Sequence, residues 1–412
     1  MMPGVEAQGL VKILVIGSGG REHAIAWRLA REGHQVAGAP GNPGIAQVGE
    51  IRATTDYAAA AEGMDLIVVG PEAPLVAGVV DDLRSRGLAV VGPNRQNAQL
   101  EASKIHSKGF MRRIGIPTAR FERVESAEAG IDALPKFEYP VVIKADGLAA
   151  GKGVIIAQDR AEAERAIHSL GPRLVIEEFL QGEEVSFIVI SDGRSCVALE
   201  ATQDHKTVGD DDTGPNTGGM GAYCDGRILS SAQAGVVMDT IIEPAIRVTG
   251  FTGFLYAGLM MTAAGPKVLE FNVRLGDPET QPLMHRMSAS TSFADVLMGS
   301  ATGSLAGARI EWNREPSVCV VMAAAGYPGQ VRTGDVITGI DDSGARVFQA
   351  GTRVGVHGLE TAGGRVLGVT SSGADLPAAI ASTYAAVGKI HFEGMHYRRD
   401  IGAKGLRRWG TI

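Results

Sequence analysis

The sequence predicts a multidomain protein of the α/β and α+β classes, with an open, mainly parallel N-terminal sheet and a small, mainly β C-terminal domain. The chain has 412 residues, which is more than one ordinary domain contains. Apolar strands, glycine turns and helical patterns alternate over the first hundred residues, as in a parallel sheet. From about residue 315 the pattern changes to short strands and glycine turns with one late helix at 374–387.

Composition excludes several classes of protein. Hydrophobic residues make up 45% and charged residues 21% of the chain, which is sufficient for well-packed cores. The formal charge of −7 makes a long polyanion such as DNA a poor partner, whereas small anionic ligands remain compatible. We therefore expect no nucleic-acid partner.

Cysteine usage and the N-terminal residues bear on the cellular compartment. Cys196, Cys224 and Cys319 are far apart and form no CxxC pair, so neither a disulfide framework nor a zinc site is indicated. The start, MMPGVEAQG, lacks the features of a signal peptide, and no apolar run reaches membrane-spanning length. The sequence predicts a cytoplasmic protein without a membrane partner, and a disordered extension over residues 1–10.

In the first hundred residues, three strands are followed by glycine loops. The strands are VKILVI (11–16), DLIVVG (65–70) and LAVVGP (88–93), and the first runs into a helix that contains REHAIAWRLARE. Ligands of open α/β sheets bind beyond the carboxyl ends of the strands. The loops Gly17–Arg21, Gly70–Glu72 and Gly92–Asn94 are predicted to lie at that edge.

The first of these loops, GSGGREHA (17–24), has the composition of an anion-binding turn. Backbone N–H groups at the start of a helix suit a phosphate. A dinucleotide-binding fingerprint needs glycine where Glu22 stands, which argues against NAD. Arg21 and His23 favour a phosphorylated sugar. A purely structural glycine turn remains the alternative.

The stretch VIKADGLAAGKGVII (142–156) resembles a phosphate loop at first sight. A P-loop needs glycine where Asp146 stands and a hydroxyl where Gly153 stands, so that reading fails. The flanking β-branched residues instead predict a hairpin with a flexible tip at 151–153. Lys144 in its first strand, and Lys104 in a predicted helix at 100–115, could contact a polyphosphate, although a single lysine is more often a surface residue.

The remaining middle region carries two further candidate segments. VIEEFLQGEE (175–184) could offer backbone groups to an adenine and a carboxylate to a ribose, or it could be a solvated strand end. In LEFNVRLGDPE (269–279), Glu270 and Asn272 face one side of a strand, as two oxygen ligands for Mg²⁺ would. Arg274 extends that face and could bind a carboxylate or phosphate. The alternative is that these three residues form only a polar rim of the sheet.

A long polar segment, DHKTVGDDDTGPNTGGMGAY (204–223), predicts a functional loop that changes shape on ligand binding. Its chemistry alone does not identify a ligand, and a solvated turn is the alternative for its three aspartates. His205 is expected to be structural.

The other expected elements are a helix at 159–169, a strand at 173–180, an antiparallel pair within 184–201, a helix near Ser230 kinked at Pro244, and two strands around the turn 264–266.

Taken together, these segments resemble the phosphoribosylamine–glycine ligases (glycinamide ribonucleotide synthetases), a family of ATP-grasp ligases. The resemblance runs from about residue 11 to the end, and the DHK…TGPNTGGMGAY and GDPETQP blocks are its most specific parts. It implies a pre-ATP-grasp N-terminal domain at 11–103, an ATP-grasp domain at 104–312 with a lid subdomain at about 122–195, and a C-terminal domain at 313–412. The hairpin at 142–156 would belong to the lid.

The resemblance also implies roles for individual residues. Lys144 and Arg274 would be catalytic, and Glu270 and Asn272 would hold Mg²⁺ or Mn²⁺. ATP would be bound by Lys104, Lys144, Gly151, Lys152, Gly153, Glu177, Glu178, Phe179, Leu180 and Glu184. The substrates glycine and 5-phosphoribosylamine would be bound by Gly17, Gly19, Gly20, Arg21, Glu22, His23, Asp204, Lys206, Asp212, Thr213, Pro215, Asn216, Gly219, Met220, Gly221, Arg274, Gly276, Asp277 and Pro278.

Many ATP-grasp proteins have a further acid about a dozen residues before the Glu-x-Asn motif. Here that region reads Gly258-Leu259-Met260-Met261, which leaves a third protein ligand for the metal in doubt. The implied reaction joins glycine to 5-phosphoribosylamine with ATP, through a glycyl phosphate, in purine biosynthesis. We hypothesise that the acidic run 210–212 attracts the ammonium group of glycine, and we expect a monomer or weak dimer.

Three alternatives remain open. Another ATP-grasp ligase, such as a purine-pathway carboxylase or a D-alanine ligase, would share the nucleotide site. A nucleotide-binding regulatory protein would keep the fold without turnover, although the intact Lys144, Glu270 and Asn272 argue against it. A dehydrogenase is the weakest alternative because the third fingerprint glycine is missing.

Overall fold

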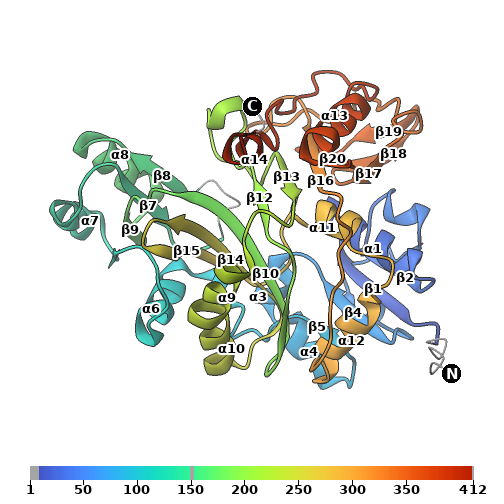
Figure 1. Ribbon diagram of the computed structural model, residues 1–412, viewed down its shortest axis with the longest axis horizontal. Helices are drawn as coiled ribbons and strands as arrows, with labels where there is room; N and C mark the ends of the chain where they lie inside the picture. The colour runs from blue at the N-terminus through green and yellow to red at the C-terminus, as the bar shows by residue number, and fades with distance from the viewer. Residues whose placement is uncertain (1–8, 149–152, 411–412) are drawn as a thin grey trace.

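The computed structural model describes residues 9–148 and 153–410 and contains three sheets of four or more strands. Figure 1 shows the N-terminal sheet and the lid on opposite sides of a long central sheet, with the C-terminal strands above the N-terminal sheet. The fold class predicted from the sequence is confirmed. No helix within the described residues is long and apolar enough to cross a membrane.

The N-terminal sheet is parallel, with the strand order β3-β2-β1-β4-β5. Its strands are β1 (Lys12–Gly17), β2 (Gln35–Pro40), β3 (Glu50–Ile51), β4 (Leu66–Val69) and β5 (Val90–Val91). The helices are α1 (Gly20–Arg31), α2 (Tyr57–Ala60), α3 (Glu72–Ala77) and α4 (Val79–Ser85). The strand–glycine–helix alternation in the sequence therefore predicted this part correctly, and the glycine loops follow the carboxyl ends of β1, β4 and β5.

The lid is a four-stranded sheet with the order β6-β9-β7-β8 and one helical face. It consists of β6 (Phe121–Val124), α7 (Ala127–Ala133), β7 (Val141–Ala145), β8 (Val154–Ala157), α8 (Arg160–Leu170) and β9 (Leu174–Glu178). The predicted hairpin is confirmed: β7 and β8 are antiparallel, with Lys144 opposite Val154. The expected lid boundary near 195 is wrong, because the next strand, β10, already belongs to the central sheet.

The central sheet has nine strands and joins the middle and C-terminal regions. Its order is β15-β14-β10-β12-β13-β16-β20-β17, with β11 beside β10. The middle region supplies β10 (Glu183–Asp192), β11 (Cys196–Ala198), β12 (Thr202–Asp204), β13 (Gly221–Cys224), β14 (Thr252–Thr262) and β15 (Gly265–Asn272). The C-terminal region supplies β16 (Ser317–Ala323), β17 (Arg346–Gln349) and β20 (Arg365–Ser372), and β16 pairs antiparallel with β13.

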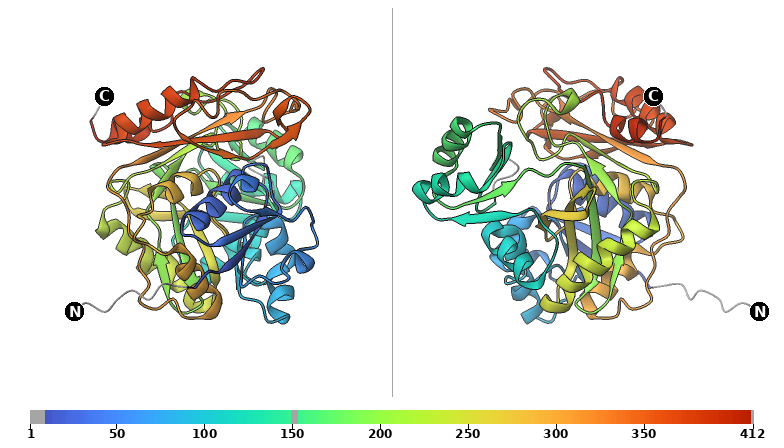
Figure 2. Two further views of the ribbon diagram at one scale, coloured as in Figure 1. Left: turned by 90° about the vertical axis from the view of Figure 1, so that its right-hand side faces the viewer. Right: turned by 60° about the vertical axis from the view of Figure 1, so that its left-hand side comes forward.

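The C-terminal strands are thus an extension of the central sheet. Figure 2 shows them lying across the top of the molecule. A short hairpin, β18 (Thr352–Gly355) and β19 (Gly358–Thr361), and the helices α13 (Leu376–Val387) and α14 (Ala403–Arg408) complete this region. The late helix expected at 374–387 is confirmed.

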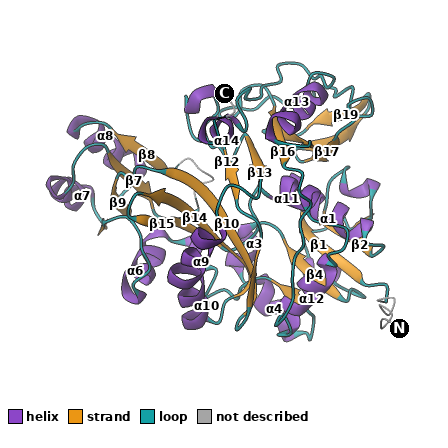
Figure 3. Ribbon diagram, viewed as in Figure 1, coloured by secondary structure: helices purple, strands orange, loops and turns teal. Residues whose placement is uncertain are grey.

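Two expected helices differ from the prediction, as Figure 3 helps to show. The helix expected at 100–115 is two helices, α5 (Gln99–Ala102) and α6 (Lys104–Ile114), because the extended backbone of Ser103 interrupts it and the Ser103 side chain caps α6. The helix after Ser230 is α9 (Ser231–Val237), followed by a π-helical segment (Met238–Ile242) and α10 (Glu243–Thr249), with Pro244 in the first turn of α10. The remaining helices are α11 (Thr280–Arg286) and α12 (Phe293–Thr302).

Arg28 fastens the N-terminal domain to the rest of the protein. Its guanidinium donates to the backbone oxygens of Met287, Ser288 and Thr291 and to the carboxylate of Glu32. Arg28→Ala is expected to lower the free energy of unfolding by about 2 kcal/mol, because buried acceptors lose their donors. Urea unfolding measures this loss. Arg86→Ala, on the N-terminal domain, serves as the comparison, and an equal effect of both changes would contradict the explanation.

Candidate active site

A buried Lys–Glu–Lys group lies where the lid meets the central sheet. Lys144 of β7 and Lys108 of α6 both contact one carboxylate oxygen of Glu177 in β9, with Nζ–Oε2 distances of 3.1 and 3.0 Å. Lys144 also donates to the backbone oxygen of Leu269, in β15, at 3.2 Å. The lysine predicted from the hairpin is therefore held beside the strand that carries the predicted metal ligands.

Lys104 reaches the same region from the start of α6. Ser103 and the N–H of Ile105 both donate to Asp146, which follows β7, at 2.9 and 3.1 Å. The Lys104 ammonium donates to the backbone oxygen of Gly147 at 2.9 Å. The break at Ser103 thus directs Lys104 toward the hairpin. Gly151 and Lys152, predicted to bind ATP, lie outside the described residues, and Gly153 directly precedes β8.

The Glu-x-Asn pair occupies the end of β15. Opposite β14, the pairing of the strands shifts between Gly258 and Leu259, and Gly258 faces Glu270. Burial opposes ionisation, but Lys206, Lys144 and Lys104 together lower the pKa of Glu270, so its carboxylate is charged at neutral pH. Asn272 is 9% exposed on the same strand. Their positions two apart give two oxygen donors on one face, which fits Mg²⁺ or Mn²⁺.

No group of three or more His, Cys, Asp or Glu side chains within residues 9–148 and 153–410 is arranged to hold a metal by itself. A metal at Glu270 and Asn272 therefore fits only a site that nucleotide phosphates and water complete. The glycine opposite Glu270 agrees with the missing third acid noted in the sequence.

Arg274 follows the predicted metal-binding pair and is fixed by two acids. Its Nη2 lies 2.8 Å from Glu101 of α5, and its Nε lies 3.4 Å from Glu72 of α3. Burial opposes the effect, but Glu101 and Glu72 raise the pKa of Arg274. The guanidinium is therefore a permanent, preoriented cation between the N-terminal domain and β15.

The predicted adenine segment, 177–180, covers the end of β9 and the two residues after it. Glu178 pairs with Lys267 at 3.0 Å, and Phe179 is 38% exposed. Leu180 packs with Ala119 and Met260 in a small apolar cluster. The side chain of Glu177 points the other way, to Lys108 and Lys144, which leaves the backbone of this segment as the part available to a base.

A second group of charges surrounds Lys206. Its ammonium lies 2.7 Å from Glu184, which begins β10 with Glu183. Burial and the carboxylates of Glu279 and Glu184 raise the pKa of Asp204 to about 7, although Lys206 opposes this rise. Acids therefore outnumber cations around Asp204, so this group can attract a cation.

Glu279 completes that group from the GDPETQP segment. Its Oε1 accepts from the hydroxyls of Tyr256, at 2.6 Å, and Ser186, at 3.2 Å. Glu279 is 3% exposed, and the local turn leaves no room for a side chain at Gly276. These contacts place the carboxylate between β10, β14 and the Gly276–Pro278 turn.

The acidic run 210–212 does not face this group. Asp212 contacts Arg398 and Lys404 at 3.1 and 2.8 Å, and the Asp210 carboxylate accepts from the backbone N–H of Arg399 at 2.7 Å. The run instead anchors its loop to the segment before α14, which the sequence could not indicate. Our hypothesis that these aspartates attract glycine is therefore not supported by their contacts.

The loop around the acidic run is a narrow hairpin. Thr207 bridges to Asn216, Val208 donates to the backbone of Pro215, and Gly209 donates to that of Thr213. Met220 and Gly221 are buried at the start of β13. Of the predicted substrate residues in this segment, Asp204, Lys206 and Gly219 therefore face the other site elements, whereas Asp212 and Thr213 lie toward the C-terminal region.

The N-terminal glycine loop meets the GDPETQP turn. A side chain at Gly19 would lie 3.7 Å from Asp277, and one at Gly219 would clash with Pro278 at 2.5 Å. Glu22 accepts from the N–H of Gly19 at 2.6 Å. The close packing explains the glycines and brings together three segments that are remote in sequence: 17–22, 218–219 and 276–281.

Two residues of the N-terminal loop have different roles. Arg21 contacts Glu22 and donates to the backbone oxygen of Leu275, so it lies against the turn. His23 is 1% exposed, packs edge-on against Phe348 and accepts from the N–H of Gln349 at 2.8 Å. Burial lowers the pKa of His23 to about 3. The expectation that His23 faces a sugar phosphate is therefore wrong: it joins α1 to β17.

Three site residues were not predicted from the sequence. Lys108 is the second of two lysines in the predicted helix at 100–115, and Glu279 follows a recognised turn without a distinguishing pattern. Arg365 comes from β20 and donates to the Asp277 carboxylate at 2.9 Å and to the backbone oxygen of Gly218 at 2.6 Å. No local signal marks Arg365, because its partners are separated from it by most of a domain.

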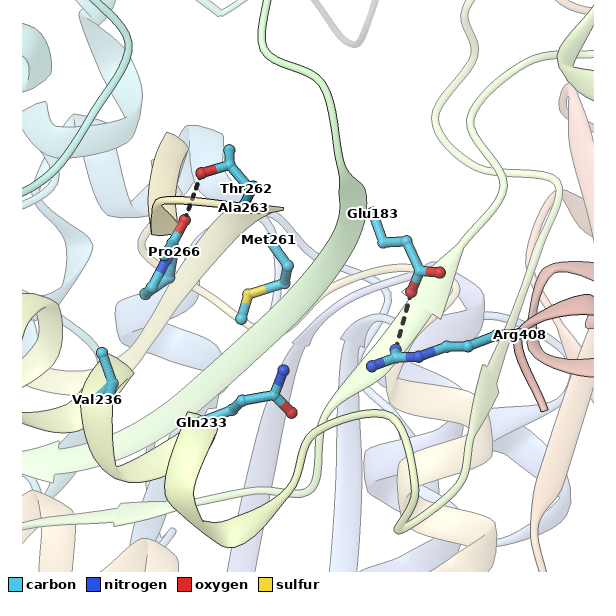
Figure 4. Close-up of a pocket in the computed structure, with 9 residues that line it drawn as sticks. Glu183, Gln233, Val236, Met261, Thr262, Ala263, Pro266 and Arg408 are labelled. Carbon is cyan, nitrogen blue, oxygen red and sulfur yellow. Dashed lines mark hydrogen bonds and ion pairs between the residues drawn. The ribbon is translucent and has the colours of Figure 1, made fainter.

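A pocket of about 380 Å³ lies away from these residues, between α9, the β14–β15 turn and α14. Figure 4 shows the ion pair of Glu183 with Arg408 in this pocket. It also shows the hydrogen bond that the Thr262 hydroxyl donates to the backbone oxygen of Gly265 in the same turn. Its charged groups are paired with each other, and we assign no role to it.

Comparison with known proteins gives matches along nearly the whole chain. Three family models of phosphoribosylglycinamide synthetase match: the N domain at residues 11–101, the ATP-grasp (A) domain at 102–280 and the C domain at 317–404. A phosphoribosylamine–glycine ligase of Ralstonia nicotianae is 47% identical, with 97% of this chain and 100% of that protein covered. One of Escherichia coli K12 is 45% identical, with 97% and 99% covered.

Solved structures also match this chain. A crystal structure of phosphoribosylamine–glycine ligase from Thermotoga maritima matches with a TM-score of 0.84 and 36% identity, covering 95% of this chain and 100% of that one. The biotin carboxylase domain of a Hydrogenobacter thermophilus 2-oxoglutarate carboxylase, solved with MgADP, matches with a TM-score of 0.73 and 16% identity, covering 95% and 92%. The latter likeness concerns the fold alone.

Proposed function

The chain belongs to the phosphoribosylglycinamide synthetase family, and from this premise we propose how its residues carry out the family reaction. The reaction joins glycine to 5-phosphoribosylamine with ATP and gives glycinamide ribonucleotide, ADP and phosphate, a step of purine biosynthesis. The observation that carries the assignment of the site is the contact of Lys144, in the lid, with the backbone oxygen of Leu269, which directly precedes Glu270 in β15. Lys206, Lys144 and Lys104 lower the pKa of Glu270, which agrees with a cationic site around this carboxylate.

ATP lies between the lid and the central sheet in this proposal. Its adenine meets the backbone of residues 177–180, and Glu184 accepts from a ribose hydroxyl. Lys144 and Lys104 contact the phosphates. A divalent metal held by Glu270 and Asn272 would supply charge neutralisation for the phosphates and fix their orientation.

In the first step, a carboxylate oxygen of glycine attacks the γ-phosphorus of ATP. The bond from that phosphorus to the β-phosphate bridging oxygen breaks, ADP leaves, and a glycyl phosphate forms. Lys144 and Arg274 stabilise the negative charge on the transferring group, and no Ser or Cys nucleophile is needed.

In the second step, the amine of 5-phosphoribosylamine attacks the carbonyl carbon of glycyl phosphate. The carbon–oxygen bond to phosphate breaks, and phosphate leaves with one of the original carboxylate oxygens. The Gly17–Gly20 loop at the start of α1 holds the sugar phosphate beside Asp277 and Gly219. The lid excludes water from the acyl phosphate.

The route of the oxygen atoms tests the reaction directly. With glycine labelled by ¹⁸O in its carboxylate, ATP and 5-phosphoribosylamine, one labelled oxygen is expected in each phosphate released. Mass spectrometry of the phosphate measures it. Unlabelled phosphate would rule out the acyl phosphate route.

In this proposal the ammonium group of glycine binds beside Asp204 and not at the acidic run 210–212. The pKa of Asp204 is raised to about 7, so its carboxylate is charged above that pH and becomes neutral as the pH falls through it. From about pH 8 to about pH 6 the KM for glycine is therefore expected to rise, by up to about tenfold per pH unit below the pKa.

Initial rates at saturating ATP measure this dependence. Asp204→Asn should have a high KM for glycine throughout and should lose the dependence on pH. A pH-independent KM in the unaltered protein would show that Asp204 does not meet the ammonium group.

A further inference from the structure

Lys108 is the most deeply buried lysine of the site and has no place in the reaction as described. It is 2% exposed and its Nζ lies 3.0 Å from Glu177 Oε2. It also donates to the Thr118 hydroxyl at 2.6 Å, which in turn donates to the backbone oxygen of Val268 in β15. Its ammonium also lies 5.9 Å from the centre of the Phe121 ring, so these groups enclose it and leave it unavailable to a nucleotide.

The same carboxylate oxygen of Glu177 is shared with Lys144. The distances from that oxygen to the two ammonium groups are nearly equal, 3.0 and 3.1 Å. The other oxygen of Glu177 is buried and has no hydrogen-bond partner among the described residues. Two cations and one anion leave the group with one net positive charge. Burial lowers the pKa of Lys108 to about 8, although Glu177 raises it, so Lys108 is cationic at neutral pH.

The charge of Lys108 sets the net charge of this group. Without Lys108, Lys144 would be the only cation in contact with Glu177 among residues 9–148 and 153–410, and that pair would be neutral. An ammonium paired in this way attracts a phosphate less strongly, because the potential of its partner opposes the attraction. With Lys108 present, its positive charge balances the negative charge of Glu177. The positive charge of Lys144 is then available to a phosphate.

We propose that Lys108 is a positioning residue that balances the charge of Glu177 and thereby makes the ammonium of Lys144 available to the phosphates of ATP. This inference rests on the assignment of the nucleotide site above. Lys108 acts through Glu177 and touches no substrate. Its contact with Thr118 also links α6 to β15, so the lysine pair is held in register with the strand that carries Glu270.

Two variants separate charge balance from simple packing. Lys108→Met removes the cation and keeps most of the side-chain volume, leaving a neutral Glu177–Lys144 pair. Lys108→Met with Glu177→Gln restores one net positive charge while removing a second buried polar contact. If Lys108 served only packing or stability, the double variant would be at least as damaged as the single one.

Calorimetric titration with a non-hydrolysable ATP analogue and Mg²⁺ measures the effect. Lys108→Met is expected to weaken binding at least tenfold, and the double variant is expected to return to within about threefold of the unaltered protein. Binding by the double variant that is no tighter than that of Lys108→Met would overturn the proposal, as would unchanged binding by Lys108→Met. Thermal unfolding confirms that each variant is folded before titration.

Lys136→Met is the matched control. Lys136 pairs with Glu122 at 3.1 Å in the lid but is exposed, so its loss is expected to leave nucleotide binding unchanged. Binding of the analogue by the unaltered protein tests the nucleotide site itself, independently of the comparison between variants. If the unaltered protein binds no analogue, the site assignment fails; if it binds and the double variant is not rescued, only the role of Lys108 fails.

Discussion

Replacing Glu270 by glutamine is expected to lower kcat/KM by about 10³-fold, the largest loss of any single change in this site. The side chain keeps its size and one oxygen but loses its charge, which is the feature a hard divalent cation requires. Lys206, Lys144 and Lys104 lie close enough to lower the pKa of the Glu270 carboxyl, and in the variant these cations repel the metal without a compensating anion.

Steady-state kinetics over a range of Mg²⁺ concentrations measure the change. The activity of Glu270→Gln should recover in part at high Mg²⁺, because the affinity for the metal is what is lost. Glu122→Gln, which removes an exposed carboxylate in the lid, provides the control and should change kcat/KM little. Activity of Glu270→Gln within about threefold of the unaltered protein would contradict the assignment of the metal site.

The parts of the site that the sequence predicted are those encoded within one element. Glu270 and Asn272 are two residues apart in one strand, and that spacing alone places them on one face. Lys144 lies in a hairpin whose strands and turn are all local. The parallel N-terminal sheet was predictable for the same reason, because strand, glycine and helix follow each other directly in the chain.

The parts that were not predictable depend on partners remote in sequence. In the sequence alone, the acidic run 210–212 indicates a ligand-binding feature. In the structure, Asp212 of this run contacts Arg398 and Lys404. His23 follows a turn with the composition of an anion-binding turn, but the packing of β17 against α1 makes His23 a structural contact. The break between α5 and α6 is similar, because the contact of Ser103 with Asp146 stabilises a residue that helical periodicity alone would include in the helix.

Burial and charge together explain why the site tolerates so many ionised groups. Each deeply buried cation has an acid within contact distance: Lys108 and Lys144 share Glu177, and Arg274 has Glu101. Unpaired buried charges would be strongly unfavourable. In the proposed site, ATP and a divalent metal would add charges of both signs to this network. Binding would then change the charge balance around each of these residues, and this balance would link the lid to the central sheet.

Replacing Lys144 by methionine is expected to lower kcat/KM by about 10²-fold or more, with kcat falling as well as the apparent affinity for ATP. The ammonium joins the lid to β15 through the backbone oxygen of Leu269 and contacts Glu177. Its removal therefore weakens phosphate binding and leaves Lys108 as the one ion-pair partner of Glu177 within the described part of the chain. Negative charge develops on the β–γ bridging oxygen as its bond to the transferring phosphorus breaks, so the loss exceeds the effect on ground-state binding. Separate measurement of kcat and of the KM values for ATP and glycine distinguishes the two effects.

Lys144→Arg should recover part of kcat, because it restores the charge with altered geometry. An unchanged kcat with only a raised KM for ATP would show that Lys144 binds the nucleotide without stabilising phosphoryl transfer.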